Sequence, residues 1–249
     1  MTIGTRLRGW ATAAALIVAS SCGGGGSSGG SASGSPPSTG TPGSLSRFAI
    51  VGDRLYTVGK SELQSFDIRR PWDPVKKGIA WVGWNIETLG GHENLLLIGS
   101  SDGLYIFDTA NPDQPQRRGR LLHATARDPV VAQGGTAYLT LSGTINQLDV
   151  IDIQDPSAPR LLRSYPMRRP QGLGLDGKHL FLCDGEDGLK VFDATDPMDL
   201  KQVDRVPGLL PRDLIAADQL LVTTTQIGVF QYSYASLPLR FLSQLGYRR

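Results

Sequence analysis

This chain has almost no cysteine or histidine. Of its two cysteines among 249 residues, only Cys183 lies beyond position 22, so no internal disulfide can form in a folded body and packing must stabilise it. The three histidines are His92, His123 and His179, and none is spaced with a second ligand as in the HExxH pattern. No Gly-x-Ser-x-Gly elbow is present either. The sequence therefore predicts no metal, no cofactor and no enzymatic activity.

An excess of one charge and a long apolar run are also missing. The chain has 25 Lys and Arg against 23 Asp and Glu; without Arg6 and Arg8 the balance is 23 against 23, and no basic block stands out. Such a neutral body argues against a nucleic-acid partner. The apolar stretch at residues 10–19 has ten residues, whereas a transmembrane helix needs about 20.

The first 22 residues have the pattern of an export signal. Arg6 and Arg8 precede the apolar stretch, and small residues follow it at positions 19–21, directly before Cys22. This segment resembles the bacterial lipobox, with Ala19 in place of the usual Leu. The resemblance implies that Cys22 is lipidated and anchors the protein in the membrane. The alternative is an ordinary secretory peptide cleaved near Ser21.

A segment of low complexity follows at residues 23–44. It contains nine Gly, seven Ser and three Pro among 22 residues, with no charge. Such a composition cannot bury enough apolar surface to fold, so we expect a disordered tether. Its r.m.s. reach would be about 25 Å, from roughly 5–6 Å times the square root of its length. Because Gly23 is not the Asp that marks inner-membrane retention in many lipoproteins, we expect the outer membrane of a bacterial cell envelope.

Residues 45–249 contain five copies of one motif. Its aligned anchors are spaced by 41, 44, 41 and 40 residues. A proline lies four residues after each of the first four anchors. The copies read SFDIRRPWDP (65–74), IFDTANPDQP (106–115), VIDIQDPSAP (150–159), VFDATDPMDL (191–200) and QYSYASLPLR (231–240). A period near 40 with short apolar runs indicates a β-repeat architecture.

Each copy has four candidate strands. In the second copy they are residues 85–89, 95–98, 104–108 and 116–122, separated by turn residues such as Asp102-Gly103. Twenty short strands predict an all-β, five-bladed β-propeller. The first strand begins near Phe48 and the last ends near Leu245, so no blade needs to mix the two termini. We therefore expect the ring to close by packing of the first blade against the fifth.

The copies resemble the LVIVD repeat, a bacterial propeller-type repeat in which an apolar strand ends in Asp before an Asp/Asn-Pro-x-x-Pro turn. Residues 150–159 match it best, and the match covers most of residues 47–234. The fifth copy departs from it, with Ser233 in place of Asp. The resemblance implies an exported or surface protein and supplies no catalytic residue.

The repeated aspartates are the first candidate site. Because Asp bonds the backbone two residues on, we expect these residues to cap turns; a cation site on the propeller axis is the alternative. They are Asp67, Asp108, Asp152 and Asp193.

Four arginines lie at or just before the first strand of their copies: Arg47, Arg127, Arg169 and Arg212. If that strand lines the channel, their guanidinium groups would gather at one mouth and bind a carboxylate or phosphate. Ion pairs between blades, with Asp128 and Asp213, are the alternative.

Three further features have simpler interpretations. The acidic residues 184–187 occupy a hairpin position, so we expect a polar turn and no calcium site. Cys183 follows two apolar residues, and we expect a buried, inert thiol. Trp72, Trp81 and Trp84 are expected to fill space between blades, with an exposed aromatic patch as the alternative.

The main functional prediction is a lipid-anchored module that binds a protein or an envelope polymer. One alternative is a propeller enzyme of the hydrolase or lyase type at the channel mouth. Another is a small-anion binder that uses the four arginines. The fold alone cannot decide between these functions.

Overall fold

The computed structural model describes residues 45–122, 126–127 and 129–247. The expected signal peptide (1–22) and tether (23–44) lie outside this range. Within the described residues no helix is long and apolar enough to cross a bilayer. The elements are β1 (Phe48–Val51), β2 (Arg54–Val58), β3 (Glu62–Asp67), β4 (Val75–Trp81), β5 (Ile86–His92), β6 (Leu95–Ser100), β7 (Gly103–Asp108), β8 (Gln116–Leu122), β9 (Ala126–Arg127), β10 (Val130–Gln133), β11 (Thr136–Gly143), β12 (Gln147–Asp152), β13 (Arg160–Pro166), β14 (Leu173–Asp176), β15 (His179–Cys183), η1 (Gly185–Asp187), β16 (Leu189–Asp193), β17 (Lys201–Val206), β18 (Pro211–Ala217), β19 (Leu220–Thr225), β20 (Gly228–Ser233) and β21 (Arg240–Gly246).

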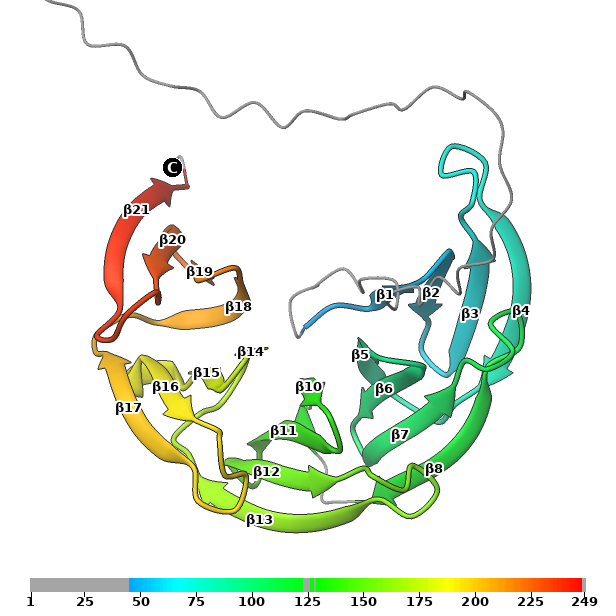
Figure 1. Ribbon diagram of the computed structural model, residues 1–249, viewed down its shortest axis with the longest axis horizontal. Helices are drawn as coiled ribbons and strands as arrows, with labels where there is room; N and C mark the ends of the chain where they lie inside the picture. The colour runs from blue at the N-terminus through cyan, green and yellow to red at the C-terminus, as the bar shows by residue number, and fades with distance from the viewer. Residues whose placement is uncertain (1–44, 123–125, 128, 248–249) are drawn as a thin grey trace, which may run out of the picture. The chain divides into compact units, whose positions relative to one another are not determined.

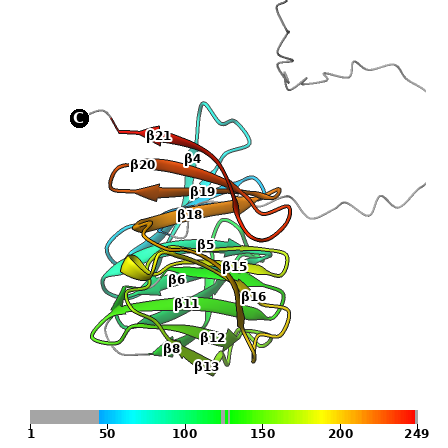
Figure 2. The same cartoon turned by 90° about the vertical axis from the view of Figure 1, so that its left-hand side faces the viewer.

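The strands form five antiparallel sheets, each built from four consecutive strands, with β9 as an addition to the third. The sheets are the blades of a propeller: β1, β5, β10, β14 and β18 are innermost, and β4, β8, β13, β17 and β21 form the rim (Figure 1). Seen from the side, the strands of the fifth blade lie at one end of the view and the rim strands β8 and β13 lie at the other (Figure 2). The predicted five-bladed, all-β architecture is confirmed.

Tight turns join the first two strands of each blade, where the sequence has its Gly and Asp residues. Gly52 and Gly134 have φ of 60° and 54°, the left-handed conformation that a primed hairpin turn needs. In the second and fifth blades Glu93 and Asp218 adopt the same conformation, both with φ of 52°. Local turn chemistry therefore sets the boundaries of these hairpins.

Four hydrophobic clusters lie between successive blades. Tyr56 of the first blade packs with Leu96 and Phe107 of the second. The clusters of the next three junctions are equally buried. The hydrophobic core is thus divided into four parts, one at each junction between successive blades.

In the second to fifth blades, the proline turn docks on the rim strand of the preceding blade. The contact lies at a β-bulge, at Gly78, Gly119, Arg163 or Asp204. A Cβ on Gly78 would collide with the carbonyl oxygen of Asp113, and one on Gly119 with that of Pro156. At the third junction an Arg163 nitrogen donates to the Met198 carbonyl at 2.6 Å, and at the fourth the Leu239 N–H donates to Asp204 at 2.5 Å.

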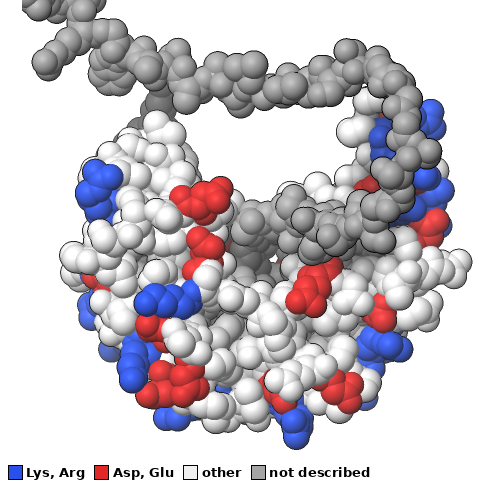
Figure 3. Space-filling model, viewed as in Figure 1, with Lys and Arg blue, Asp and Glu red and all other residues white. Residues whose placement is uncertain are grey.

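The ring does not close as expected. Extensive contacts join β1 to β5, β5 to β10, β10 to β14 and β14 to β18, and among the described residues none of similar extent joins β18 to β1. The ring is open between the first and fifth blades (Figures 1 and 3). The predicted packing of these two blades is therefore wrong. The angle between blades follows from the four buried junctions, which leave the ends apart.

Candidate functional site

A cavity of about 590 Å³ is lined by residues of the third, fourth and fifth blades and by Leu45, which precedes the first blade. Prolines and leucines form part of its wall. Its polar lining residues are Ser142, Arg169, Gln171, Arg212 and Gln226. The cavity thus combines two cations with amide and hydroxyl groups on an apolar wall, as is common in ligand sites.

The buried ion pair of Asp184 and Lys190 fixes the position of the backbone next to Arg169. Asp184 is fully buried and accepts hydrogen bonds from the backbone N–H groups of Arg168 and Arg169, at 3.0 and 2.8 Å. The Lys190 Nζ lies 2.5 Å from the same carboxylate and 3.1 Å from that of Asp187. These contacts hold the segment just before β14 at the edge of the cavity.

Close packing of inner strands places Arg212 beside this segment. The Gly172 N–H donates to the Arg212 carbonyl at 2.9 Å, and a Cβ on Gly172 would collide with Asp213. Among the described residues, neither Arg169 nor Arg212 forms an ion pair through its guanidinium group. Two planar cations at one cavity suit the carboxylate or phosphate group of a ligand.

Arg47 is not gathered with this pair. The Arg47 guanidinium donates to the carbonyls of Ile86 and Gly59, at 2.8 and 2.6 Å, and so joins the first two blades. Arg127 belongs to β9, and its side chain lies outside the described residues. Of the three predicted arginines whose side chains the structure describes, two line the same cavity and Arg47 does not.

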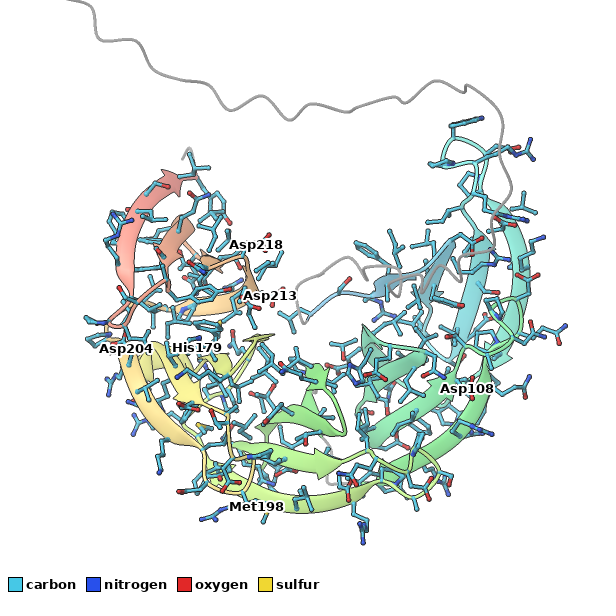
Figure 4. The ribbon with its side chains drawn as sticks, viewed as in Figure 1. Asp108, His179, Met198, Asp204, Asp213 and Asp218 are labelled. Atoms are coloured by element: carbon cyan, nitrogen blue, oxygen red, sulfur yellow. The ribbon has the colours of Figure 1, made fainter. Side chains whose placement is uncertain are left out.

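The repeated aspartates lie at the ends of the third strands. Figure 4 shows Asp108 near the rim, whereas Asp213 faces the central opening. Each aspartate accepts a backbone N–H two residues on, and Ser233 does so in the fifth blade. The donors are Arg69 for Asp67, Ala110 for Asp108, Gln154 for Asp152, Thr195 for Asp193 and Ala235 for Ser233.

These turns also lower carboxyl pKa values. Hydrogen bonds from the Arg69 side chain and backbone hold the pKa of Asp67 well below its usual range. Bonds from Gln154 and Arg160 lower the pKa of Asp152, and those from Thr195 lower that of Asp193. All three are acceptors in turns, and the described residues contain no group of three or more His, Cys, Asp or Glu side chains that could hold a metal.

Cys183, His92 and His179 pack or hydrogen-bond within the fold. Cys183 is buried between the fourth and fifth blades, and burial raises the pKa of its thiol. The His92 ring lies 2.7 Å from the Gly134 carbonyl, and the His179 ring packs edge-on against Tyr234. His123 lies outside the described residues.

Two expectations need correction here. Residues 184–187 do form the turn between β15 and β16, but Asp184 is buried in the ion pair with Lys190. The tryptophans do not fill space between blades: Trp72, Trp81 and Trp84 are 82%, 54% and 70% exposed. The first of these corrections could have been anticipated, since a lysine within the apolar strand Leu189–Asp193 needs a nearby carboxylate. No sequence signal marked Gln171 and Gln226 as cavity residues, because they lie outside the repeated motif.

No protein-family model matches this chain, and no curated protein matches it. Solved structures share its fold. One is a functionally unknown protein from Desulfotomaculum acetoxidans, with a TM-score of 0.72, 11% identity and coverage of 81% of this chain and 69% of the other. The periplasmic gluconolactonase PpgL from Pseudomonas aeruginosa has a TM-score of 0.59 at 14% identity, with coverage of 78% and 66%.

BamB from Moraxella catarrhalis has a TM-score of 0.57 at 11% identity, with coverage of 74% of this chain and 55% of the other. The chain thus spans 55% to 69% of the lengths of these three proteins. Similarity at such low identity shows the propeller fold alone.

Proposed function

We propose that this chain is a non-catalytic binding module, tethered by lipid at Cys22 to the bacterial cell envelope. Its ligand is a protein or an envelope polymer that places carboxylate or phosphate groups in the cavity beside Arg169 and Arg212. The observation that carries the proposal is the pairing of these arginines at one cavity without ion-pair partners among the described residues. The repeats, which resemble LVIVD repeats, and the predicted tether fit the same function.

The site can be tested with the full chain and two polyanions, polyphosphate and polyglutamate, as probes. We expect at least one probe to bind and to raise the melting temperature. Because hydrogen bonds to charged groups contribute about 1.5–3 kcal/mol each, Arg169→Gln and Arg212→Gln should each weaken binding about tenfold or more. Arg240→Gln, in rim strand β21, is the matched control. Equal loss in all three variants would point to unspecific attraction and contradict the site.

The natural ligand can be sought by affinity capture from envelope extracts. The wild-type chain should retain a component that Arg212→Gln loses, and raised salt should weaken its retention because salt screens exposed charges. Mass spectrometry of the mature N-terminus tests the tether separately. An unmodified Cys22 would end the lipoprotein proposal and leave the cavity proposal standing.

A second candidate is hydrolysis at the same cavity, as in the enzyme alternative above. The observation that favours it is the shared fold with a periplasmic gluconolactonase. The described lining residues include arginines, glutamines and a serine and no histidine or carboxylate, so they supply no evident general base. Turnover of a sugar lactone that is lost in both Arg169→Gln and Arg212→Gln, and kept in Arg240→Gln, would favour this candidate.

A further inference from the structure

The two faces of the propeller are built from different loops. One face, which we call the hairpin face, consists of the loops between the second and third strands of each blade and of the links from each rim strand to the next inner strand. The other, the turn face, consists of the turns between the first and second strands and of the proline turns. In the side view the hairpin face lies on the left, where β21 ends (Figure 2).

Every blade exposes a large apolar side chain on the hairpin face. From the first blade to the fifth these are Trp84, Leu122, Ile145, Leu210 and Ile227, with exposed fractions from 40% to 70%. Trp81 packs edge-on against Trp84, with 6.3 Å between the ring centroids, and Tyr247 is half-exposed at the end of β21. Tryptophan and tyrosine are enriched where a bilayer meets water, because their rings have both apolar and polar parts.

The two faces also differ in charge. The loops of the turn face contain eight acidic and three basic residues, so this face is acidic. On the hairpin face the carboxylates of Asp184 and Asp187 are paired with Lys190. Arg169 and Arg212 have no ion-pair partner within the described part of the chain. An anionic surface would therefore attract the hairpin face and repel the turn face.

The N-terminal segment joins the body on the hairpin face. Leu45 lines the same cavity as Leu210 and Gln226, which both belong to loops of this face. The expected tether at residues 23–44 has a reach of about 25 Å and follows Cys22 directly. A lipid at Cys22 would therefore hold the hairpin face close to the bilayer.

From these features we propose that the hairpin face lies on the surface of a bilayer that contains anionic lipids. The exposed apolar side chains enter the boundary between headgroups and acyl chains, as in other proteins that lie on a membrane. The turn face points away, because anionic headgroups repel its carboxylates. The cavity belongs to the hairpin face, so the polymer that binds it would be anchored in the same bilayer. This last point rests on the proposed function, whereas the docking itself does not.

Tryptophan fluorescence can show which face meets the bilayer, because Trp81 and Trp84 belong to the hairpin face and Trp72 belongs to the turn face. All samples are full chains with Cys22→Ser, which removes the lipid, and Trp10→Phe. Vesicles of phosphatidylcholine and phosphatidylglycerol with brominated acyl chains quench tryptophans that enter them. In a Trp72→Phe chain the fluorescence should be quenched and shift to shorter wavelength. In a chain with Trp81→Tyr and Trp84→Tyr, Trp72 should keep its intensity although the chain floats with the vesicles.

Two glutamate substitutions in the fifth blade, added to the Trp72→Phe chain, compare its two faces. Ile227→Glu, at a hairpin-face residue that is 61% exposed, should reduce the quenching by at least half. Leu220→Glu, at the turn-face end of β19 and 37% exposed, should leave the quenching unchanged. Circular dichroism checks that each chain is folded, and Leu245→Glu replaces Ile227→Glu if that chain is not.

A Trp72→Phe chain without quenching would overturn the proposal. Equal quenching of Trp72, or an equal effect of the two glutamates, would overturn it as well. The measurement needs no ligand in the cavity, so its failure would leave the binding of polyanions by Arg169 and Arg212 standing.

Discussion

Lys190 and Asp184 form an ion pair within the fourth blade, with the Nζ 2.5 Å from a carboxylate whose side chain is fully buried. The pair lies between the cavity segment and the strand β16. It links the packing of this blade to the placement of Arg169, because the same carboxylate binds the Arg169 backbone N–H.

Lys190→Met should therefore destabilise the protein strongly. Removing one partner of a buried pair leaves an uncompensated charge, at a cost of about 3–5 kcal/mol in the free energy of unfolding. Lys178→Met is the control from the same blade, because Lys178 is 59% exposed in its pair with Asp193, and exposed pairs contribute about 0–1 kcal/mol. Urea unfolding measures both, and equal losses would mean that the pair at Lys190 is solvated.

Acid should weaken the fold through the turn aspartates. The pKa of Asp67 is lowered from 3.8 by hydrogen bonds from Arg69, so the folded state favours the carboxylate. Its stabilising contribution is present above the unfolded pKa and is lost as the pH falls through the folded pKa. Unfolding free energies measured from neutral pH to about pH 2 should fall less steeply in Asp67→Asn than in wild type. Parallel curves would contradict the lowered pKa.

Because a proline turn packs directly on Gly119, we expect this position to tolerate no side chain. Gly119→Ala would drive a Cβ into the Pro156 carbonyl of the next blade, and overpacking of this kind costs about 1–3 kcal/mol. At Gly59 an added Cβ would make only ordinary contact, 3.8 Å from the Glu62 carbonyl. Thermal unfolding should therefore separate Gly119→Ala from Gly59→Ala, and equal midpoints would show that the turn moves freely.

The open ring predicts unequal effects at one repeated position. Leu96→Ala removes a fully buried side chain and should cost about 2–5 kcal/mol. Leu55→Ala makes the same change at the equivalent position of the first blade, where the side chain is half-buried, and should cost less than half as much.

Urea unfolding gives the comparison. Equal costs would mean that the fifth blade covers Leu55 and Phe66 of the first blade, and the open ring would be wrong.

The architecture could be predicted from the sequence because the motifs that indicate it act locally. The Asp and Pro residues of the turns and the Gly residues of the hairpins recur in register, and each acts within a few residues of its own position. The opening of the ring has no such local sign, because it depends on the angle that side-chain volumes set at four separate junctions.

The candidate site was only partly predictable for a related reason. The position of Arg169 and Arg212 before inner strands followed from the repeat, and these two do line one cavity. The same reasoning failed for Arg47, because its carbonyl partners at Ile86 and Gly59 come from segments that the repeat pattern does not mark. The exposure of Trp72 could not be foreseen either, since it depends on whether another blade precedes the first.

The chemistry of the bulge residues has a consequence for how such a protein can diverge. The bulge residues match their neighbouring turns by three different means. Gly78 and Gly119 leave room for a carbonyl, Arg163 supplies a guanidinium donor and Asp204 supplies a carboxylate acceptor. A duplicated or transplanted blade would meet the wrong neighbour on both sides. The bulge residue of each rim strand therefore fixes which blade can follow it. A blade can be exchanged only together with the proline turn that packs against its rim strand.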